Sequence, residues 1–229
     1  MEVVATPESV RDEAALATEK RDAALEVPVF GRRNLTIAGI LFVVALGCLL
    51  ALEKAFHIAI HGVSGAPHYI YQAQSFLQGR WDIDLPARVT DIIVLHGKDY
   101  IVYPPMPAIL MLPGVAIFGL KFSDILFTTL FSAVNLPLLF LLFEQVRANG
   151  LTRRSWVEHV ILSIALFFGS INLWLSLGGR MWFTAHILCF TFTLLAMLVA
   201  FRRHYAWAAV LLGCAFFCRA TVAFGFVFL

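Results

Sequence analysis

Charged residues are scarce in this chain. Only 14% of its 229 residues are charged, 60% are hydrophobic, and the mean hydropathy is +0.83. Soluble domains are about half apolar and about a quarter charged, so this composition excludes an ordinary soluble domain and predicts an integral membrane protein. The net charge of +2 is also too small for a nucleic-acid-binding surface.

Cysteine is scarce as well, and its spacing excludes a cysteine-based metal site. The sequence has no CxxC pair and no Cys/His spacing typical of zinc. All four cysteines lie in apolar runs: Cys48, Cys189, Cys214 and Cys218. Because free cysteines in such places pack as small hydrophobic side chains, we expect reduced thiols in the protein core.

The apolar residues fall into runs long enough to cross a membrane. A spanning helix needs about 20 mostly apolar residues. Five runs approach this length: Leu35–Leu52, Phe122–Phe143, Val157–Leu177, Met181–Phe201 and Ala206–Leu229. A shorter apolar stretch, Pro104–Gly119, is interrupted by Pro107, Pro113 and Gly114.

Basic residues predict the side on which each connection lies. Arg32 and Arg33 precede the first run, and multiply basic connections follow the second and fourth runs. If Pro104–Gly119 lies along the membrane surface, all three basic clusters fall on the cytoplasmic side, as the positive-inside rule requires. The sequence therefore predicts five spans in the cell membrane, a cytoplasmic N-terminus and an outer loop of residues 54–121.

Two domains follow from this pattern. Residues 1–33 are a polar cytoplasmic segment, with a helix expected over Pro7–Glu26 because Thr6 and Pro7 form a helix start. Residues 34–229 are the multispanning membrane domain. Because the chain stops at Leu229 inside an apolar run, we expect it to be a fragment of a longer protein.

The outer loop has its own predicted elements. Tyr69–Gln78 has the pattern of a short amphipathic helix. Ile92–Leu95 and Tyr100–Tyr103 flank the turn residues His96-Gly97-Lys98-Asp99, which predicts a hairpin. The fold class is therefore an all-α integral membrane protein of about five transmembrane helices, with two interfacial helices and a small β-hairpin in the outer loop.

Two carboxylates in this loop are candidates for chemistry. Asp82 and Asp84 alternate in WDIDLP, so in an extended chain both side chains point the same way. Such a pair can act as a general base, hold a divalent cation or position a sugar hydroxyl. The alternative is a solvated loop.

Several basic residues are candidates for binding. Arg180 at the end of two spans can grip a lipid phosphate or extend to headgroups. Arg219 lies inside the last apolar run, where an arginine usually faces a cavity or a partner. His186 either lines the same cavity or packs between helices. Glu53 and Glu144 are interpreted as charges at the membrane boundary.

The chain also contains an ordered series of short motifs from Leu35 onward. They are Tyr69-x-Tyr71-x-Ala73-x-x-Phe76-Leu77-x-Gly79-Arg80, Asp82, Leu85-Pro86, Gly97-Lys98-x-Tyr100, Tyr103-Pro104-Pro105-Met106-Pro107, Phe118-Gly119, Met181-Trp182-Phe183 and Cys218-Arg219-Ala220-Thr221. In this order the chain resembles the GT-C membrane glycosyltransferases that use polyprenyl-phosphate sugar donors, including the protein O-mannosyltransferase and aminoarabinose-transferase branches.

The resemblance implies an inverting sugar transfer on the outer face of the membrane. A carboxylate of the first outer loop would activate the acceptor hydroxyl of a lipid, glycan or protein. Basic residues would hold the donor phosphate, for which Arg180 and Arg219 are the candidates. Tyr69, Tyr103 and His186 complete the predicted substrate-binding set, and membrane lipids are the remaining partners.

One departure from the family pattern leaves the base open. The family carries an acidic residue just after the first span, but this chain reads Ser64-Gly65-Ala66-Pro67-His68 there. Asp82, Asp84 or His68 would then supply the base, or the chain is catalytically silent. A transporter or lipid-binding membrane protein is the other alternative, although the sequence shows no internal repeat of the kind that transporters have.

Overall fold

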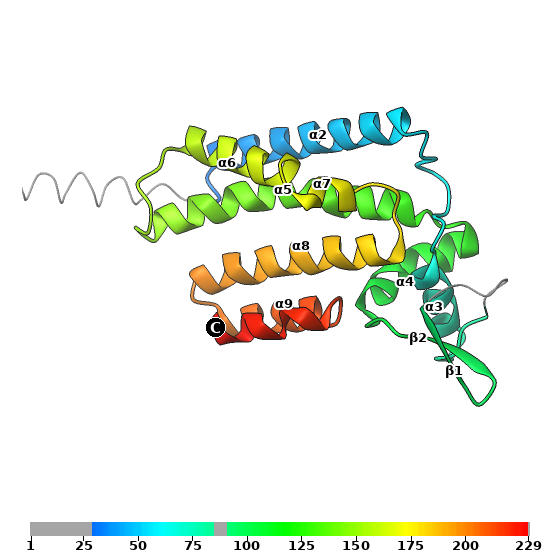
Figure 1. Ribbon diagram of the computed structural model, residues 1–229. Helices are drawn as coiled ribbons and strands as arrows, with labels where there is room; N and C mark the ends of the chain where they lie inside the picture. Colours follow the sequence, from blue (N-terminus) through cyan, green and yellow to red (C-terminus); the bar gives the residue numbers. More distant parts are fainter. Residues whose placement is uncertain (1–28, 85–90, 229) are drawn as a thin grey trace, which may run out of the picture.

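Helices make up most of the chain. The structure, a computed structural model, describes residues 29–84 and 91–228 (Figure 1). The elements are α2 (Arg32–Ala55), α3 (His68–Leu77), β1 (Ile92–Leu95), β2 (Lys98–Ile101), α4 (Met106–Phe118), η1 (Gly119–Lys121), α5 (Asp124–Ala148), α6 (Trp156–Phe168), α7 (Ile171–Leu175), α8 (Met181–Phe201), α9 (Tyr205–Phe216) and η2 (Ala220–Phe228). The helix expected over Pro7–Glu26 lies outside the described residues.

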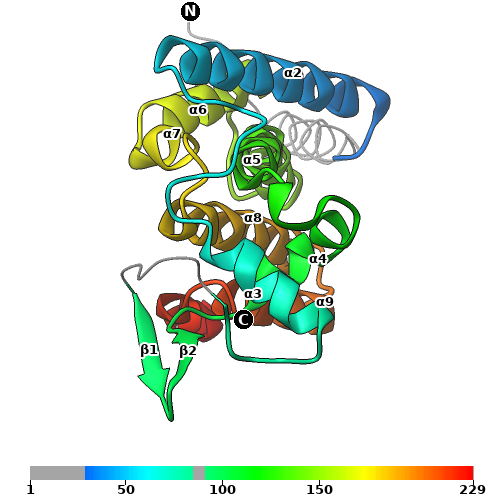
Figure 2. The same cartoon turned by 90° about the vertical axis from the view of Figure 1, so that its right-hand side faces the viewer.

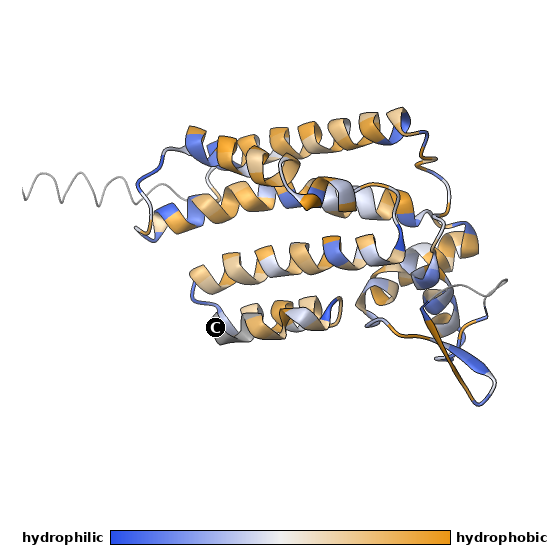
Figure 3. Ribbon diagram, in the orientation of Figure 1, coloured by the Kyte–Doolittle hydropathy of each residue, from blue (hydrophilic) through white to orange (hydrophobic). Residues whose placement is uncertain are grey.

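Three helices are long and apolar enough to cross a membrane: α2, α5 and α8. They have 24, 25 and 21 residues, so at a rise of about 1.5 Å per residue each exceeds the roughly 30 Å of a bilayer core. Figure 3 shows that apolar residues cover these helices while polar residues gather in the connections. The chain is therefore a membrane protein.

The long helices lie side by side, with α5 and α8 in the middle. α5 packs against α2, α6 and α8, and α8 packs in turn against α9. Figures 1 and 2 show α2, α6 and α7 on one side of α8 and α9 on the other, with α3, α4 and the hairpin gathered at one end. We call this end, where α2 finishes and α5 and α8 begin, the hairpin end.

Hydrogen bonds between helices hold the bundle together. The hydroxyl of Thr129 donates to Glu53 Oε1 over 2.8 Å, joining α5 to α2. The hydroxyl of Thr191 donates to Asn135 Oδ1 over 2.7 Å, joining α8 to α5. Lipid supplies no hydrophobic force between apolar helices, so such bonds and close packing carry the association. Glu53, in the last turn of α2, is only 1% exposed and is therefore buried between helices rather than solvated.

Two of the predicted spans are broken helices. The run Val157–Leu177 divides into α6 and α7, because Gly169 ends the first and the hydroxyl of Ser170 accepts from the backbone N–H of Asn172 to start the second. The last run divides into α9 and η2. α6 has 13 residues and α9 has 12, fewer than the about 20 of a full span. The described residues thus contain three helices of spanning length.

The loop elements follow the prediction with one correction. α3 and β1 match the expected segments within one residue at each end. The second strand, however, begins at Lys98, two residues earlier than predicted, and Lys98 and Asp99 pair with β1. The turn is therefore only His96-Gly97, and both residues have positive φ, as a type I′ turn requires.

Candidate functional site

The two loop carboxylates converge on one arginine. Asp82 Oδ2 lies 3.1 Å from Arg80 Nη1, and Asp84 accepts a short hydrogen bond from Nη2 of the same guanidinium. Asp82 Oδ1 also lies 3.2 Å from Lys98 Nζ in β2. Between the carboxylates, the backbone N–H of Ile83 donates to Asp99 O over 2.9 Å and fastens the segment to the hairpin.

These ion pairs make the loop carboxylates weaker bases. The hydrogen bond from Arg80 lowers the pKa of Asp84 below its ordinary value. Partial loss of hydration raises the pKa of Asp82, but the hydrogen bond and charge of Lys98, together with Arg80, outweigh it and lower the pKa overall. Two cations and two anions balance in this cluster, whose visible role is to hold the hairpin against the end of α3.

A second group of polar side chains lies between α3, α8 and α9. We define the Tyr69–Arg219 cluster as Tyr69, Tyr103, Trp182, His186 and Arg219. Trp182 Nε1 donates to the Tyr103 hydroxyl over 2.7 Å. Tyr69 is 2% exposed, and burial raises the pKa of its hydroxyl, with Cys218 adding to the rise and the charge of Arg219 opposing it. The phenol is thus neutral and lies within electrostatic reach of a guanidinium.

The cluster contains polar atoms without protein partners. Among the described residues, Tyr69 Oη and Arg219 Nη1 are buried and have no hydrogen-bond partner. His186 lies within electrostatic reach of Arg219. A buried donor that lacks an acceptor costs about 1–3 kcal/mol, and more when it is charged. Guanidinium groups bind phosphate and carboxylate oxygens strongly, so the arrangement suits an anion.

Arg219 occupies an unexpected backbone position. The sequence predicts it inside a helical span, but α9 ends at Phe216 and Arg219 lies between α9 and η2. The backbone N–H of Met106, the first residue of α4, donates to Phe217 O over 3.1 Å and satisfies a carbonyl that the helix end leaves open. The helix break therefore joins the backbone just before Arg219 to the start of α4.

The remaining predicted residues are Arg180, which lies apart from this cluster, and His68, which directly precedes Tyr69 in the chain. Arg180 is exposed at the N-cap of α8 and lines a separate pocket of about 340 Å³. His68 is the first residue of α3 and is buried. The structure thus brings together Tyr69, Tyr103, His186 and Arg219, but it separates Asp82 and Asp84 into the ion-paired cluster.

Sequence reasoning missed Asp124. This first residue of α5 is 2% exposed; its Oδ1 accepts from the backbone N–H of Ser64 over 2.8 Å and its Oδ2 from the Ser64 hydroxyl over 2.6 Å. A carboxylate therefore lies beside the segment after the first span, although it comes from another helix. Ser123 and Asp124 have only the pattern of an ordinary helix start, so no sequence signal marked the position.

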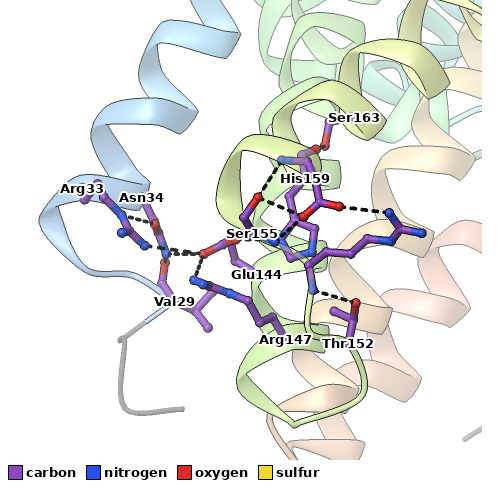
Figure 4. A network of polar contacts seen from close by, with 11 residues as sticks. Val29, Arg33, Asn34, Glu144, Arg147, Thr152, Ser155, His159 and Ser163 are labelled. Carbon is purple, nitrogen blue, oxygen red and sulfur yellow. Dashed lines mark hydrogen bonds and ion pairs between the residues drawn. The ribbon is translucent and has the colours of Figure 1, made fainter. Parts of the chain in front are cut away.

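A further buried network lies at the opposite end of the bundle (Figure 4). Glu144, near the end of α5, is 1% exposed and is therefore buried among helices rather than solvated. Its Oε1 lies 2.7 Å from His159 Nδ1 of α6, and its Oε2 accepts from Asn34 of α2 over 3.2 Å and from Arg147. These contacts join α2, α5 and α6.

Comparison with known proteins identifies no family for this chain. No protein-family model, curated protein or solved structure matches the chain. Within residues 29–84 and 91–228, no three His, Cys, Asp or Glu side chains come together as a metal site. Interpretation of the site therefore rests on its own geometry and chemistry.

Proposed function

We propose that this protein is a membrane glycosyltransferase-like protein that transfers a sugar from a polyprenyl-phosphate donor to an acceptor hydroxyl. One observation carries the proposal: the Tyr69–Arg219 cluster holds a buried guanidinium nitrogen and a buried phenol without partners. A phosphate oxygen would accept hydrogen bonds from both groups. The resemblance to polyprenyl-phosphate-dependent enzymes supplies the identity of the donor.

The proposed topology has five crossings of the cell membrane. α2, α5 and α8 are full-length spans, while α6 with α7 and α9 with η2 are broken ones. Broken spans are tolerated where other groups satisfy the freed backbone atoms, as Ser170 and Met106 do here. The N-terminus is then cytoplasmic, and residues 54–121 lie on the outer face with α3 and α4 along the membrane surface.

Asp124 is one candidate base for such a transfer, and it contacts Ser64, which lines the pocket on the other side of α8 from the Tyr69–Arg219 cluster. The Asp124 carboxylate would take the proton of the acceptor hydroxyl while the oxygen attacks the anomeric carbon and the polyprenyl phosphate leaves. Asp82 and Asp84 are both occupied by Arg80, whereas Asp124 has no ion pair among the described residues and contacts a neutral serine. His68, buried at the start of α3, is the other candidate.

A transfer assay with a radiolabelled polyprenyl-phosphate sugar tests these roles. General-base catalysis contributes about 10²–10⁴-fold, so Asp124→Asn should lose at least about 100-fold in rate. The double variant Asp82→Asn/Asp84→Asn should keep most of the activity. The reverse pattern would return the base to the loop pair.

The donor site has a separate test in donor binding. A hydrogen bond to a charged group contributes about 1.5–3 kcal/mol, so Arg219→Gln should weaken donor binding about tenfold or more. The matched control is Arg203→Gln, an exposed arginine in the connection between α8 and α9. Equal binding by both variants would contradict the assignment of Arg219.

A catalytically silent phosphate-binding protein is the second candidate. The neutralised loop carboxylates favour it, because both lie in ion pairs that hold the hairpin. It predicts donor binding that depends on Arg219, without transfer by the wild-type chain. Transfer that is lost in Asp124→Asn would exclude it.

A further inference from the structure

The pocket lined by Arg180 at the hairpin end is formed by segments far apart in the sequence. It has a volume of about 340 Å³ and lies between the segment after α2, the start of α5 and the connection from α7 to α8. Ser64, Ile125, Trp174, Arg180 and Phe183 are among its lining residues. This volume lies within the range of about 300–1,000 Å³ that is usual for ligand sites.

The pocket combines apolar walls with a single cation. Its described lining residues are mainly aromatic, aliphatic and small, and Arg180 is the one charged residue among them. Arg180 is exposed, and no described carboxylate forms an ion pair with it. Asp124, which directly precedes Ile125, is buried, and its carboxylate accepts from the backbone N–H and the hydroxyl of Ser64. The pocket therefore presents a free positive charge beside apolar surface.

This pocket is distinct from the Tyr69–Arg219 cluster. On a helix, residues three or four positions apart share a face. Arg180 and Phe183 share one face at the start of α8, whereas Trp182 and His186 share another. Figure 2 shows α3, which carries Tyr69, and α9, which ends shortly before Arg219, on the opposite side of α8 from α2 and α7, which border the pocket.

We propose that this pocket binds an anionic phospholipid, with its phosphate on Arg180 and an acyl chain along the apolar wall. The guanidinium of Arg180 supplies paired N–H donors for phosphate oxygens. The apolar lining at the end of spanning helices suits a hydrocarbon chain. A free phosphate ion would leave this apolar lining uncovered. The binding does not depend on sugar transfer, so it stands or falls separately from the proposed function.

Quenching of Trp174 fluorescence by brominated phosphatidylglycerol in detergent micelles measures this binding directly. Trp174 lines the pocket, and subtraction of a Trp174→Phe variant isolates its signal. We expect brominated phosphatidylglycerol to quench Trp174 at a concentration at least tenfold lower than brominated phosphatidylcholine does. Arg180→Gln should weaken the binding of phosphatidylglycerol about tenfold, while Arg180→Lys should weaken it less.

Two controls make the result decisive. Arg153→Gln removes an exposed arginine from the connection between α5 and α6 and should leave binding unchanged. Val63→Phe fills the pocket from a side chain that is 42% exposed, and should reduce quenching without changing the charge. Equal quenching by the two lipids would overturn the proposal, as would full binding by Arg180→Gln or by Val63→Phe. Displacement by millimolar inorganic phosphate would also contradict it, because the acyl chain would then contribute nothing.

Discussion

Gly179 shows how one residue sets the distance between two helices. Its φ is +57°, and a Cβ atom there would lie 2.5 Å from Ile125 Cα. The Thr184 hydroxyl donates to Gly179 O over 3.1 Å, and its oxygen lies 2.6 Å from the Thr128 hydroxyl of α5. The start of α8 therefore meets the start of α5 through backbone, and no side chain fits between them.

Replacement of this glycine should be costly. Gly179→Ala combines a left-handed backbone, which costs about 1–2 kcal/mol, with a backbone clash, so we expect at least about 2 kcal/mol of lost stability. The measurement is thermal unfolding in detergent. Gly79→Ala is the matched control, because Gly79 also has a positive φ of +70° but open space around it. Equal losses in both variants would show that the close approach is unimportant.

The ion-paired cluster of Arg80, Asp82, Asp84 and Lys98 predicts that the hairpin is sensitive to acid. The pKa of Asp84 is lowered in the folded protein, because Arg80 donates to the carboxylate. The ion pair therefore stabilises the hairpin above the ordinary aspartate pKa of about 3.9, and this stabilisation is lost as the pH falls through the lower folded value.

Hydrogen exchange of the Ile83 amide, which donates to Asp99 O, reports this opening. After correction for intrinsic exchange rates, its protection should fall below about pH 4 in the wild type. In the double variant Asp82→Asn/Asp84→Asn the protection should change less with pH, because both titrating carboxylates of the cluster are gone. Protection that stays constant down to pH 2 would contradict the prediction.

Among the helices, the Glu144 network makes α2, α5 and α6 depend on one carboxylate. Removal of Glu144 leaves the side chains of His159 and Arg147 without this acceptor, and leaves Asn34 with only the Val29 carbonyl. Breaking a buried pair by removing one partner costs about 3–5 kcal/mol. We therefore expect Glu144→Ala to lower the free energy of unfolding by about 3 kcal/mol, and Glu144→Gln, which keeps an acceptor, to cost less.

A double-mutant cycle separates this network from simple loss of packing. His159→Ala and Glu144→Ala should show a coupling of about 1–3 kcal/mol, because the two residues share a hydrogen bond of 2.7 Å. Glu144→Ala with Thr191→Val, a change in a different hydrogen-bonded pair, should show additive losses. Additive losses in both cycles would contradict the network.

The sequence predicts the helices better than their interruptions. Apolar length identifies α2, α5 and α8, since a spanning helix must be long and apolar. It does not reveal the break at Gly169, because Gly169 and Ser170 are also compatible with a continuous span. The sequence also places Arg219 inside a helix, whereas the structure places it after the end of α9. The carbonyl of Phe217, which this helix end leaves open, accepts from Met106, more than a hundred residues away.

The candidate site is predictable only in part for the same reason. Tyr69, Tyr103, His186 and Arg219 could be named from residue type and from the resemblance, and the fold brings them together. Asp124 could not be named, because its partner Ser64 lies sixty residues earlier, in the segment after α2. Distant contacts of this kind depend on how the whole bundle is assembled.

At the scale of the whole molecule, the five-span topology depends on α4. Its 13 residues rise only about 20 Å, less than the roughly 30 Å of a bilayer core. Between Lys98 and Arg153 the chain contains α4 and α5 as its only described helices longer than one turn. If α5 alone crosses, these two positions lie on opposite sides of the membrane; if α4 also crosses, they lie on the same side.

Cysteine labelling on intact cells distinguishes the two arrangements. A membrane-impermeant maleimide should label Lys98→Cys on intact cells, whereas Arg153→Cys should react only after permeabilisation. The wild-type chain is the control, because Cys48 lies within a spanning helix and the other three cysteines are buried or partly buried. Labelling of both variants from outside would mean that α4 crosses the membrane, and the basic connections would then lie outside. That result would contradict the proposed position of the Tyr69–Arg219 cluster on the outer face. The start of α8 would then not lie on the same face as α3, where the donor is proposed to bind.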